Sequence, residues 1–263
     1  MTRQVYGRPH APLLPRVRAL VSRACDFLLP PRCLLCGEPG VEGRDMCAAC
    51  HARLPVNPHA CPRCAVAVVI PGTCDRCQRQ APLLHSSRGA FLYRYPLDQL
   101  VQRFKFHQDL SAGRLMAELM LPCVARADRP DVVVPVPLHR SRLRRRGYDQ
   151  ALELARPLAA RLDLPLDPGL LRRNRATSAQ SELDALARRR NLRGAFSVRR
   201  QGPLPRHVAL VDDVMTTGAT MGAAAMALRR AGVERVDAWV CARTWQTCWE
   251  WPPTSIDPIG RVT

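Results

Sequence analysis

The stretch that most constrains this chain is His207 to Gly232, HVALVDDVMTTGATMGAAAMALRRAG. It opens with Val208 to Val211, an apolar run too short for a helix, which predicts a strand buried on both faces. The acids Asp212 and Asp213 end that strand, and a turn of small residues follows. An alanine-rich helix then runs into Gly232, a residue suited to a left-handed C-cap. The pattern predicts a site at the end of a strand.

The turn consists of Thr216, Thr217, Gly218, Ala219 and Thr220. It offers hydroxyls and unpaired backbone N–H groups at a helix N-terminus, where the macrodipole favours a phosphate monoester. The preceding Asp212 and Asp213 can accept hydrogen bonds from ribose hydroxyls. This order of residues resembles the phosphoribosyl diphosphate (PRPP) signature of type I phosphoribosyltransferases. The alternative is a plain strand-to-helix turn with a capping threonine, which leaves the paired acids unexplained.

Eight of the 12 cysteines form four CxxC pairs near the N-terminus. The pairs are Cys33/Cys36, Cys47/Cys50, Cys61/Cys64 and Cys74/Cys77. Two CxxC turns complete one tetrahedral zinc shell, so the sequence predicts two structural Zn²⁺ ions without an open position for catalysis. The spacers of ten and nine residues within the two halves suit two consecutive ribbons, although interleaved pairing stays open.

Redox CxxC motifs and disulfides are the alternatives to zinc. The regular repeats favour a structural metal in a reducing compartment, and the basic segment Met1 to Arg23 lacks the apolar core of an export signal. No apolar stretch reaches the roughly 18 residues that span a bilayer, so we expect a cytoplasmic protein without membrane insertion. Of the remaining cysteines Cys25, Cys123, Cys241 and Cys248, we expect Cys123 and Cys241 to be core residues.

The larger part of the chain alternates strands and helices, which predicts a parallel α/β sheet flanked by helices. The predicted strands cover 86–95, 131–136 and 235–242 besides the one at Val208. Predicted helices begin at Pro96–Asp98, cover about 111–127, and begin again near Tyr148. The segment 171–196 is polar and arginine-rich, and is interpreted either as a lid over a reactive site or as an exposed basic loop.

The strand at 131–136 runs into PVPLHRSRLRRRGYDQA, predicted to be a loop with five arginines between Arg140 and Arg146. Ligands of open parallel sheets bind beyond the C-terminal strand ends, so this loop and the Thr216–Thr220 turn are expected to face one crevice. Arg142 and Arg146 would suit a pyrophosphate. Lys105, the sole lysine in a chain that otherwise uses arginine, is a further candidate, because its position suggests a need for a compact, mobile ammonium. The alternative for Lys105 is coincidence on an exposed helix face. A solvated loop or a nucleic-acid patch is the alternative.

Taken together, the chain resembles the ComF family, which joins a double zinc ribbon to a type I phosphoribosyltransferase-like domain. The resemblance covers about residues 26–244. Its motifs here are FLLPPRCLLCG, FKF at 104–106, PVPLH with Arg142, Arg146 and Gly147, a polar pattern at Arg175, Thr177, Gln180, Leu183, Arg188, Asn191, Ala195 and Phe196, and VDDVMTTGAT. Two departures are Arg140, where proline is frequent, and Asp149, where asparagine is usual. Asp149 could weaken the pyrophosphate contact or cap the following helix.

The predicted organisation is a basic segment at 1–24, a double zinc ribbon at 25–80, a phosphoribosyltransferase-like domain at 86–245 and a loose tail at 249–263. The resemblance implies PRPP binding with Mg²⁺, Asp212 and Asp213 as catalytic residues, and a role in DNA uptake. The formal charge of +18 equally suits the alternative, a competence factor that binds single-stranded DNA or the uptake machinery and whose PRPP site is vestigial or regulatory. The sequence identifies no acceptor substrate.

Overall fold

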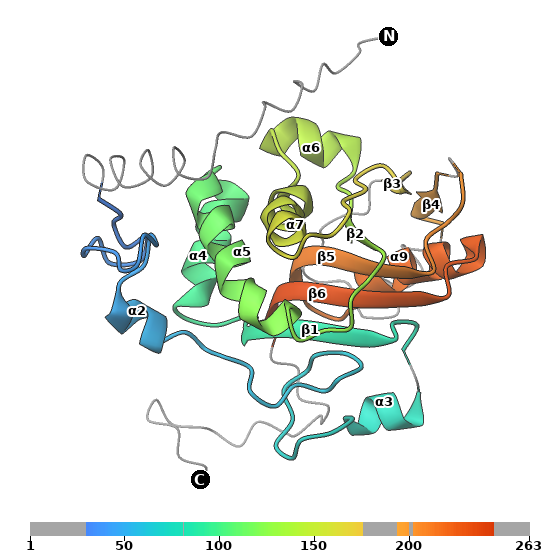
Figure 1. The fold of residues 1–263 in the computed structure, drawn as a ribbon, viewed down its shortest axis with the longest axis horizontal. Coiled ribbons are helices and arrows are strands. Elements are labelled where there is room, and N and C mark those ends of the chain that lie inside the picture. The colour runs from blue at the N-terminus through green and yellow to red at the C-terminus, as the bar shows by residue number, and fades with distance from the viewer. Residues whose placement is uncertain (1–29, 81, 176–193, 200–201, 245–263) are drawn as a thin grey trace. The chain divides into compact units, whose positions relative to one another are not determined.

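The computed structural model describes residues 30–80, 82–175, 194–199 and 202–244, and is drawn in Figure 1. The chain divides into two compact units, Met1–Ala52 and Arg53–Thr263, and the boundary falls between the second and third CxxC pairs. Predictions for the basic N-terminus, for most of the 171–196 segment, for the C-terminal tail and for Cys25 and Cys248 lie outside the described residues. Within the described ranges, no helix is both long and apolar enough to cross a bilayer.

The described part of the smaller unit is a set of turns around its cysteines. An antiparallel bridge joins Arg32 to Pro39, and the backbone N–H of Cys33 donates to the carbonyl of Glu38 at 2.8 Å. A single short helix, α2 (Ala48–Ala52), follows. Little regular structure is needed, because CxxC turns and a bound metal can order so short a segment.

The larger unit contains a four-stranded sheet in the order β1-β6-β5-β2, with every neighbouring pair parallel. Its strands are β1 (Ser86–Leu92), β2 (Val132–Pro135), β5 (His207–Met215) and β6 (Arg235–Arg243). The predicted parallel α/β sheet is therefore confirmed. Two boundaries differ from the prediction: the first strand ends at Leu92 rather than Tyr95, and β5 continues past Val211 to Met215.

Helices cover both faces of this sheet, as Figure 1 shows. On one face α5 (Leu110–Val124) and α7 (Gln150–Arg161) pack on the strands, with α4 (Leu97–Phe106) packed on α5, and on the other face lies α9 (Ala219–Ala231). The short helix α6 (Arg140–Arg146) follows β2 and buries no residue. Val208 and Leu210 pack in one core cluster with Ala224 and Leu228 of α9. Side chains alternate between faces along a strand, so Val211 points to the opposite side, where α5 and α7 pack on the sheet.

Capping residues fix where these helices begin and end. The Asp109 side chain accepts a hydrogen bond from the backbone N–H of Ala112 at 3.1 Å and starts α5. Gly232 closes α9 with a φ of 115°, a left-handed conformation that glycine adopts without strain. The expected C-cap of the alanine-rich helix is confirmed.

Two features were not predicted. The arginine-rich segment after β2 is the helix α6 rather than a loop: the His139 side chain caps its first turn at Ser141 N, and Gly147 ends it with a φ of 82°. A small antiparallel hairpin also forms from β3 (Leu171–Arg173) and β4 (Phe196–Val198). The hairpin places the two ends of the 171–196 segment next to each other.

The third and fourth CxxC pairs belong to the larger unit. The helix α3 (Asp75–Arg79) contains Cys77. An isolated bridge joins Ala60 to Ala67 around the third pair, and another joins Val56 to Phe91 of β1. The chain therefore passes directly from this cysteine-rich segment into the edge strand of the sheet.

Candidate functional site

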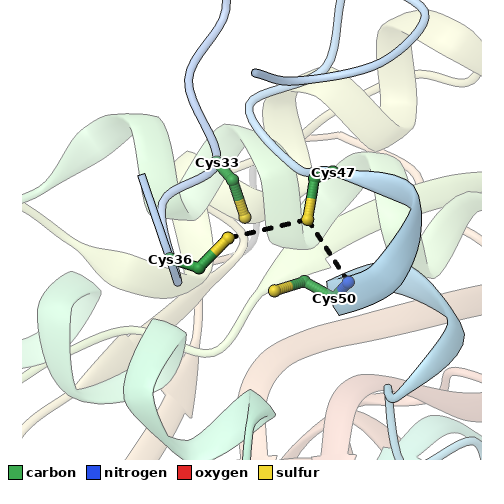
Figure 2. Close-up of side chains that lie close together, drawn as sticks. All are labelled: Cys33, Cys36, Cys47 and Cys50. Atoms are coloured by element: carbon green, nitrogen blue, oxygen red, sulfur yellow. Dashed lines mark hydrogen bonds between the residues drawn. The ribbon is translucent and has the colours of Figure 1, made fainter. Parts of the chain in front are cut away.

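The first four cysteines converge in the smaller unit, as Figure 2 shows. The sulfur atoms of Cys33, Cys36, Cys47 and Cys50 all lie within 4.8 Å of one another. Cys36 Sγ lies 3.6 Å from Cys47 Sγ, and the backbone N–H of Cys50 donates to Cys47 Sγ at 3.4 Å. Such N–H donation stabilises a thiolate ligand.

The second four cysteines form an equivalent tetrad in the larger unit. The sulfur atoms of Cys61, Cys64, Cys74 and Cys77 also lie within 4.8 Å of one another, and Cys74 N donates to Cys61 Sγ at 3.3 Å. The pairing is therefore consecutive, which resolves the alternative that the sequence left open. We name the segments around the two tetrads the first ribbon (residues 30–52) and the second ribbon (residues 53–80).

The chemistry of both tetrads fits a zinc ion. Sulfur is a donor that zinc prefers, and four converging thiols match its tetrahedral structural sites. A hydrogen bond from Cys64 lowers the pKa of Cys61 to about 4, whereas the same contact raises the pKa of Cys64. Four crowded sulfurs cannot all ionise unless a cation neutralises them. The two tetrads thus support structural Zn²⁺, with every ligand position filled by protein.

The paired acids lie within the last part of β5 rather than beyond its end. Asp212 follows the alternation of Val208 and Leu210 and points to the α9 face, so Asp213 points to the face covered by α5 and α7. The backbone N–H of Asp213 donates to Asp212 Oδ1 at 2.9 Å. The two carboxyl groups therefore leave the end of the strand on opposite faces.

Lys105 reaches this strand end from the last turn of α4. Its Nζ lies 3.1 Å from Oδ2 of Asp213, which is only 5% exposed. Loss of solvent and the neighbouring Asp213 charge together raise the pKa of Asp212 to about 7, although Lys105 opposes the rise. The predicted pyrophosphate ligand Lys105 is thus in direct contact with Asp213 of the acid pair.

The predicted phosphate turn lies between β5 and α9. Gly218 is the N-cap of α9 and has a φ of 77°, and Thr217 Oγ1 accepts from the backbone N–H of Ala219 at 3.3 Å. The turn from Thr216 to Thr220 therefore runs into the first turn of the 13-residue helix α9, where N–H groups at a helix N-terminus favour an anion.

The arginines of α6 lie near the same group of residues. Arg142 and Arg146 are one helical turn apart, and partial burial together with the charges of Arg146 and Arg145 lowers the pKa of Arg142. The Arg146 guanidinium lies 5.8 Å from the ring centre of Phe106, which directly follows Lys105. The helix thus adds positive charge close to the lysine that contacts Asp213.

Sequence reasoning missed Arg173 and left the role of Asp149 open. Burial lowers the pKa of Arg173, whose charge also interacts with Arg142 and Asp212. Asp149 accepts from the backbone N–H of Leu152 at 3.3 Å and from that of Leu138 at 3.1 Å. It therefore caps α7 and holds the segment after β2. The arginine-rich start of the 171–196 segment was the available signal for Arg173.

Comparison with known proteins gives the same two parts. Residues 24–79 match the family described as a double zinc ribbon domain, and residues 148–247 match the phosphoribosyl transferase domain. Among solved structures, orotate phosphoribosyltransferase from Aeropyrum pernix covers 52% of this chain and 62% of its own, with 23% identity and a TM-score of 0.31. That likeness is too distant to bear on function.

Several curated proteins are similar over most of their length. Competence protein F of Haemophilus influenzae is 35% identical over 81% of this chain and 96% of its own. DNA utilization protein YhgH of Escherichia coli K12 is 34% identical over 82% and 98%, and competence protein ComFC of Bacillus subtilis is 26% identical over 71% and 79%. With a double zinc ribbon ahead of a phosphoribosyltransferase domain, and with two relatives of 34–35% identity matched over 96–98% of their own length, the chain belongs to the ComF family.

Proposed function

We propose that the protein binds PRPP and acts as a phosphoribosyltransferase-type enzyme or sensor in DNA uptake. The observation that carries the proposal is the order of residues after the core of β5. Asp212 and Asp213 lie near the end of the strand, and the Thr216–Thr220 turn follows directly and leads into α9. The carboxylates can accept hydrogen bonds from ribose hydroxyls, and the turn can bind a phosphate. Their spacing suits one phosphoribosyl group. A capping turn alone needs no paired acids.

In this proposal the Thr216–Thr220 turn binds the 5′-phosphate through backbone N–H groups and hydroxyls. Asp212 and Asp213 hold the ribose hydroxyls and stabilise positive charge that develops at the anomeric carbon. Arg142 and Arg146 stabilise the departing pyrophosphate, since guanidinium groups bind several phosphate oxygens at once.

Lys105 contributes in a second way. Its ammonium lies 3.1 Å from the Asp213 carboxyl and so lowers the free-energy cost of holding two neighbouring negative charges at the end of one strand. Because Phe106 lies beneath Arg146, the lysine is also near the α6 arginines, which supports a contribution to pyrophosphate binding.

Mg²⁺ would enter with the diphosphate. Mg²⁺ keeps most of its waters and usually takes one or two carboxylates plus substrate phosphates. In the described ranges the clusters of three or more potential metal ligands are the two cysteine tetrads, so the acid pair fits a shared rather than a protein-enclosed Mg²⁺ site. When bound, the ion would neutralise charge on the diphosphate.

The test is calorimetric titration of the zinc-loaded protein with PRPP and Mg²⁺. We expect binding that is lost in Asp212→Asn/Asp213→Asn and retained in Asp98→Asn. Asp98 is a partly exposed acid in the first turn of α4, so its substitution makes the same kind of charge change away from the site. Absence of PRPP binding by folded wild-type protein would refute the proposal.

A second candidate function is binding of single-stranded DNA, with the PRPP site vestigial or regulatory. The relatives named for competence and DNA utilization support a DNA-uptake role, and α6 carries five arginines, none of them buried. Phosphate contacts make such binding strongly dependent on salt. Fluorescence anisotropy with labelled single-stranded DNA at two salt concentrations tests it, and no binding at low salt would exclude this function.

A further inference from the structure

Arg243, the last residue of β6, lies between the second ribbon and the proposed phosphate turn. Only 3% of this residue is exposed. In the sheet it pairs in register with Met215, the residue that ends β5 directly before Thr216. Burying a guanidinium is costly unless its donors are satisfied, so the partners of this side chain indicate what its position achieves.

The guanidinium joins two segments that are far apart in the sequence. Its Nε donates to the carbonyl oxygen of Cys64, a ligand of the second tetrad, at 3.0 Å. Its Nη1 donates to the carbonyl oxygen of Met215 at 3.0 Å and also to that of Thr216. One rigid, planar group thus contacts a metal-ligand turn and the first peptide groups of the proposed phosphate turn.

These contacts fix the orientation of the turn. In a trans peptide the C=O and the following N–H point in opposite directions. Arg243 holds the carbonyls of Met215 and Thr216 toward itself, so the N–H groups of Thr216 and Thr217 are directed away from it. Those N–H groups belong to the set proposed to bind the 5′-phosphate.

The second ribbon is packed firmly enough to anchor this contact. Ala65, directly after Cys64, is fully buried in the core cluster between the sheet and α9. It covers Gly89 of β1, where an added Cβ would lie 3.1 Å from the Ala65 Cβ and 3.4 Å from the Arg243 Cβ. Ser87 Oγ donates to the carbonyl of Arg63 at 2.9 Å.

A cavity lies on the same boundary. Its volume is about 940 Å³, and its walls include Cys64 and Cys77 of the second ribbon, Thr217 and Gly218 of the turn, and Arg243. The second ribbon and the phosphate turn therefore line the same cavity, and Arg243 is part of its wall.

We infer that Arg243 is a positioning residue that couples the second zinc ribbon to the phosphate turn, so that metal retention at the Cys61–Cys77 tetrad and phosphoribosyl binding reinforce each other. The inference rests on the proposed PRPP binding for its ligand, but the placement of the turn by Arg243 can be measured without one. The inference concerns the second ribbon, which belongs to the same unit as the phosphate turn.

The experiment compares wild type with Arg243→Lys, which keeps the charge but loses the planar fork. Arg235→Gln is the matched control: it removes another arginine of β6, one that donates to Asp237 at 2.9 Å at the opposite end of the strand. Hydrogen exchange of peptides covering 214–222 should be faster by about tenfold or more in Arg243→Lys, the loss expected for charge-assisted hydrogen bonds. Arg235→Gln should leave exchange in these peptides unchanged.

A second readout uses reciprocity between two bound ligands. Zinc release to a colorimetric chelator is followed with and without PRPP and Mg²⁺. PRPP should slow the release of one of the two ions in wild type and Arg235→Gln, but not in Arg243→Lys, whose PRPP affinity should fall about tenfold or more. The ion of the first ribbon serves as the internal reference.

The outcomes separate the two proposals. Unchanged turn exchange and unchanged PRPP affinity in folded Arg243→Lys would overturn the positioning role while the proposed function stood. Failure of wild type to bind PRPP would end the proposed function, and exchange across 214–222 would still decide whether Arg243 places the turn. Equal effects of Arg243→Lys and Arg235→Gln would reduce Arg243 to a residue of general stability and overturn the inference.

Discussion

The two zinc ribbons use the same ligands at nearly the same spacing but have different relations to the rest of their units. Among the residues that the structure describes, the first ribbon is ordered by hydrogen bonds within itself, as between Leu34 N and the carbonyl of Asp45 at 2.9 Å. In the second, Leu92 N of β1 donates to the carbonyl of Pro55 at 2.8 Å, and Ala65 is part of the core of the sheet. Ligand spacing defines a metal site, whereas the neighbouring residues decide what that site supports.

Metal loss should have the largest effect and should differ between the ribbons. Structural zinc contributes about 10 kcal/mol or more to the segment it folds. We expect Cys61→Ser/Cys74→Ser to lower the main thermal unfolding midpoint strongly, and Cys33→Ser/Cys47→Ser to leave it nearly unchanged, with one zinc lost per chain in each. Calorimetry with zinc analysis checks this. Equal shifts in the midpoint would mean that the ribbons do not differ.

A substitution beneath the second ribbon should reproduce part of that effect with all cysteines intact. Gly89→Val would push against Ala65 and cost about 2–3 kcal/mol of unfolding free energy. Gly113→Ala is the control, because its Cβ would lie 2.4 Å from Cε2 of Phe104, away from the ribbon. Chemical denaturation should show both variants destabilised, but zinc release should be faster only in Gly89→Val. An unaltered rate of zinc release in Gly89→Val would show that the contact between Gly89 and Ala65 does not help the second ribbon to retain its metal.

The pH dependence of stability should reveal a further unfavourable feature of the larger unit, the burial of two neighbouring carboxyls. The folded pKa of Asp212 is raised to about 7, so the folded state holds a proton that the unfolded state releases. This contribution therefore falls as pH rises toward 7 and is lost above it. Partial solvent contact limits it to about 1–2 kcal/mol.

Thermal unfolding between pH 6 and 8.5 measures this contribution in zinc-loaded protein. Asp212→Asn should remove the decline with rising pH and become relatively more stable above pH 7, whereas Asp98→Asn should keep the wild-type slope. Parallel slopes for all three proteins would show that Asp212 does not retain a proton in the folded state.

The smallest expected effect concerns one buried hydrogen bond within the second ribbon. Asn57 Nδ2 donates to the carbonyl of Ala65 at 2.9 Å, and Asn57→Ala should cost about 1 kcal/mol. Asn174→Ala, which removes the acceptor of the Ser197 hydroxyl on the β3-β4 hairpin, is the matched control. Denaturation midpoints should fall modestly in both, with faster zinc release only in Asn57→Ala. Faster release in both would contradict a local effect.

Much of this architecture could be predicted from local sequence patterns. The apolar runs at Val132 and Val208 are buried on both faces and indicate parallel strands, and CxxC spacing indicates the tetrads. Helix α6 was missed because its residues lack an apolar face, so the hydrophobic pattern that marks other helices is absent. Its capping residues, His139 and Gly147, were the only local signal.

In the candidate site, too, features that are local in the sequence could be predicted and contacts between distant segments could not. The acid pair and the turn are contiguous in sequence, so their proximity follows from one strand and one helix. The contact of Lys105 with Asp213 and the contact of Arg243 with Cys64 join segments from different parts of the chain, and they depend on how the sheet is ordered. No local pattern contains that order. Asp149 was predicted only as an unusual acid with two alternative effects, and the structure shows the capping one.

The strand order has a consequence for synthesis of the protein on the ribosome. The edge strand β1 is made before every other strand of the sheet, yet its neighbour β6 is made last. Domains fold as their segments emerge, and pairings between distant segments form slowly. The cysteines of the second ribbon therefore leave the ribosome long before the strand that completes their surroundings. We expect zinc captured during translation to keep this stretch folded until β6 arrives, so that zinc supply at that moment affects the yield of native protein.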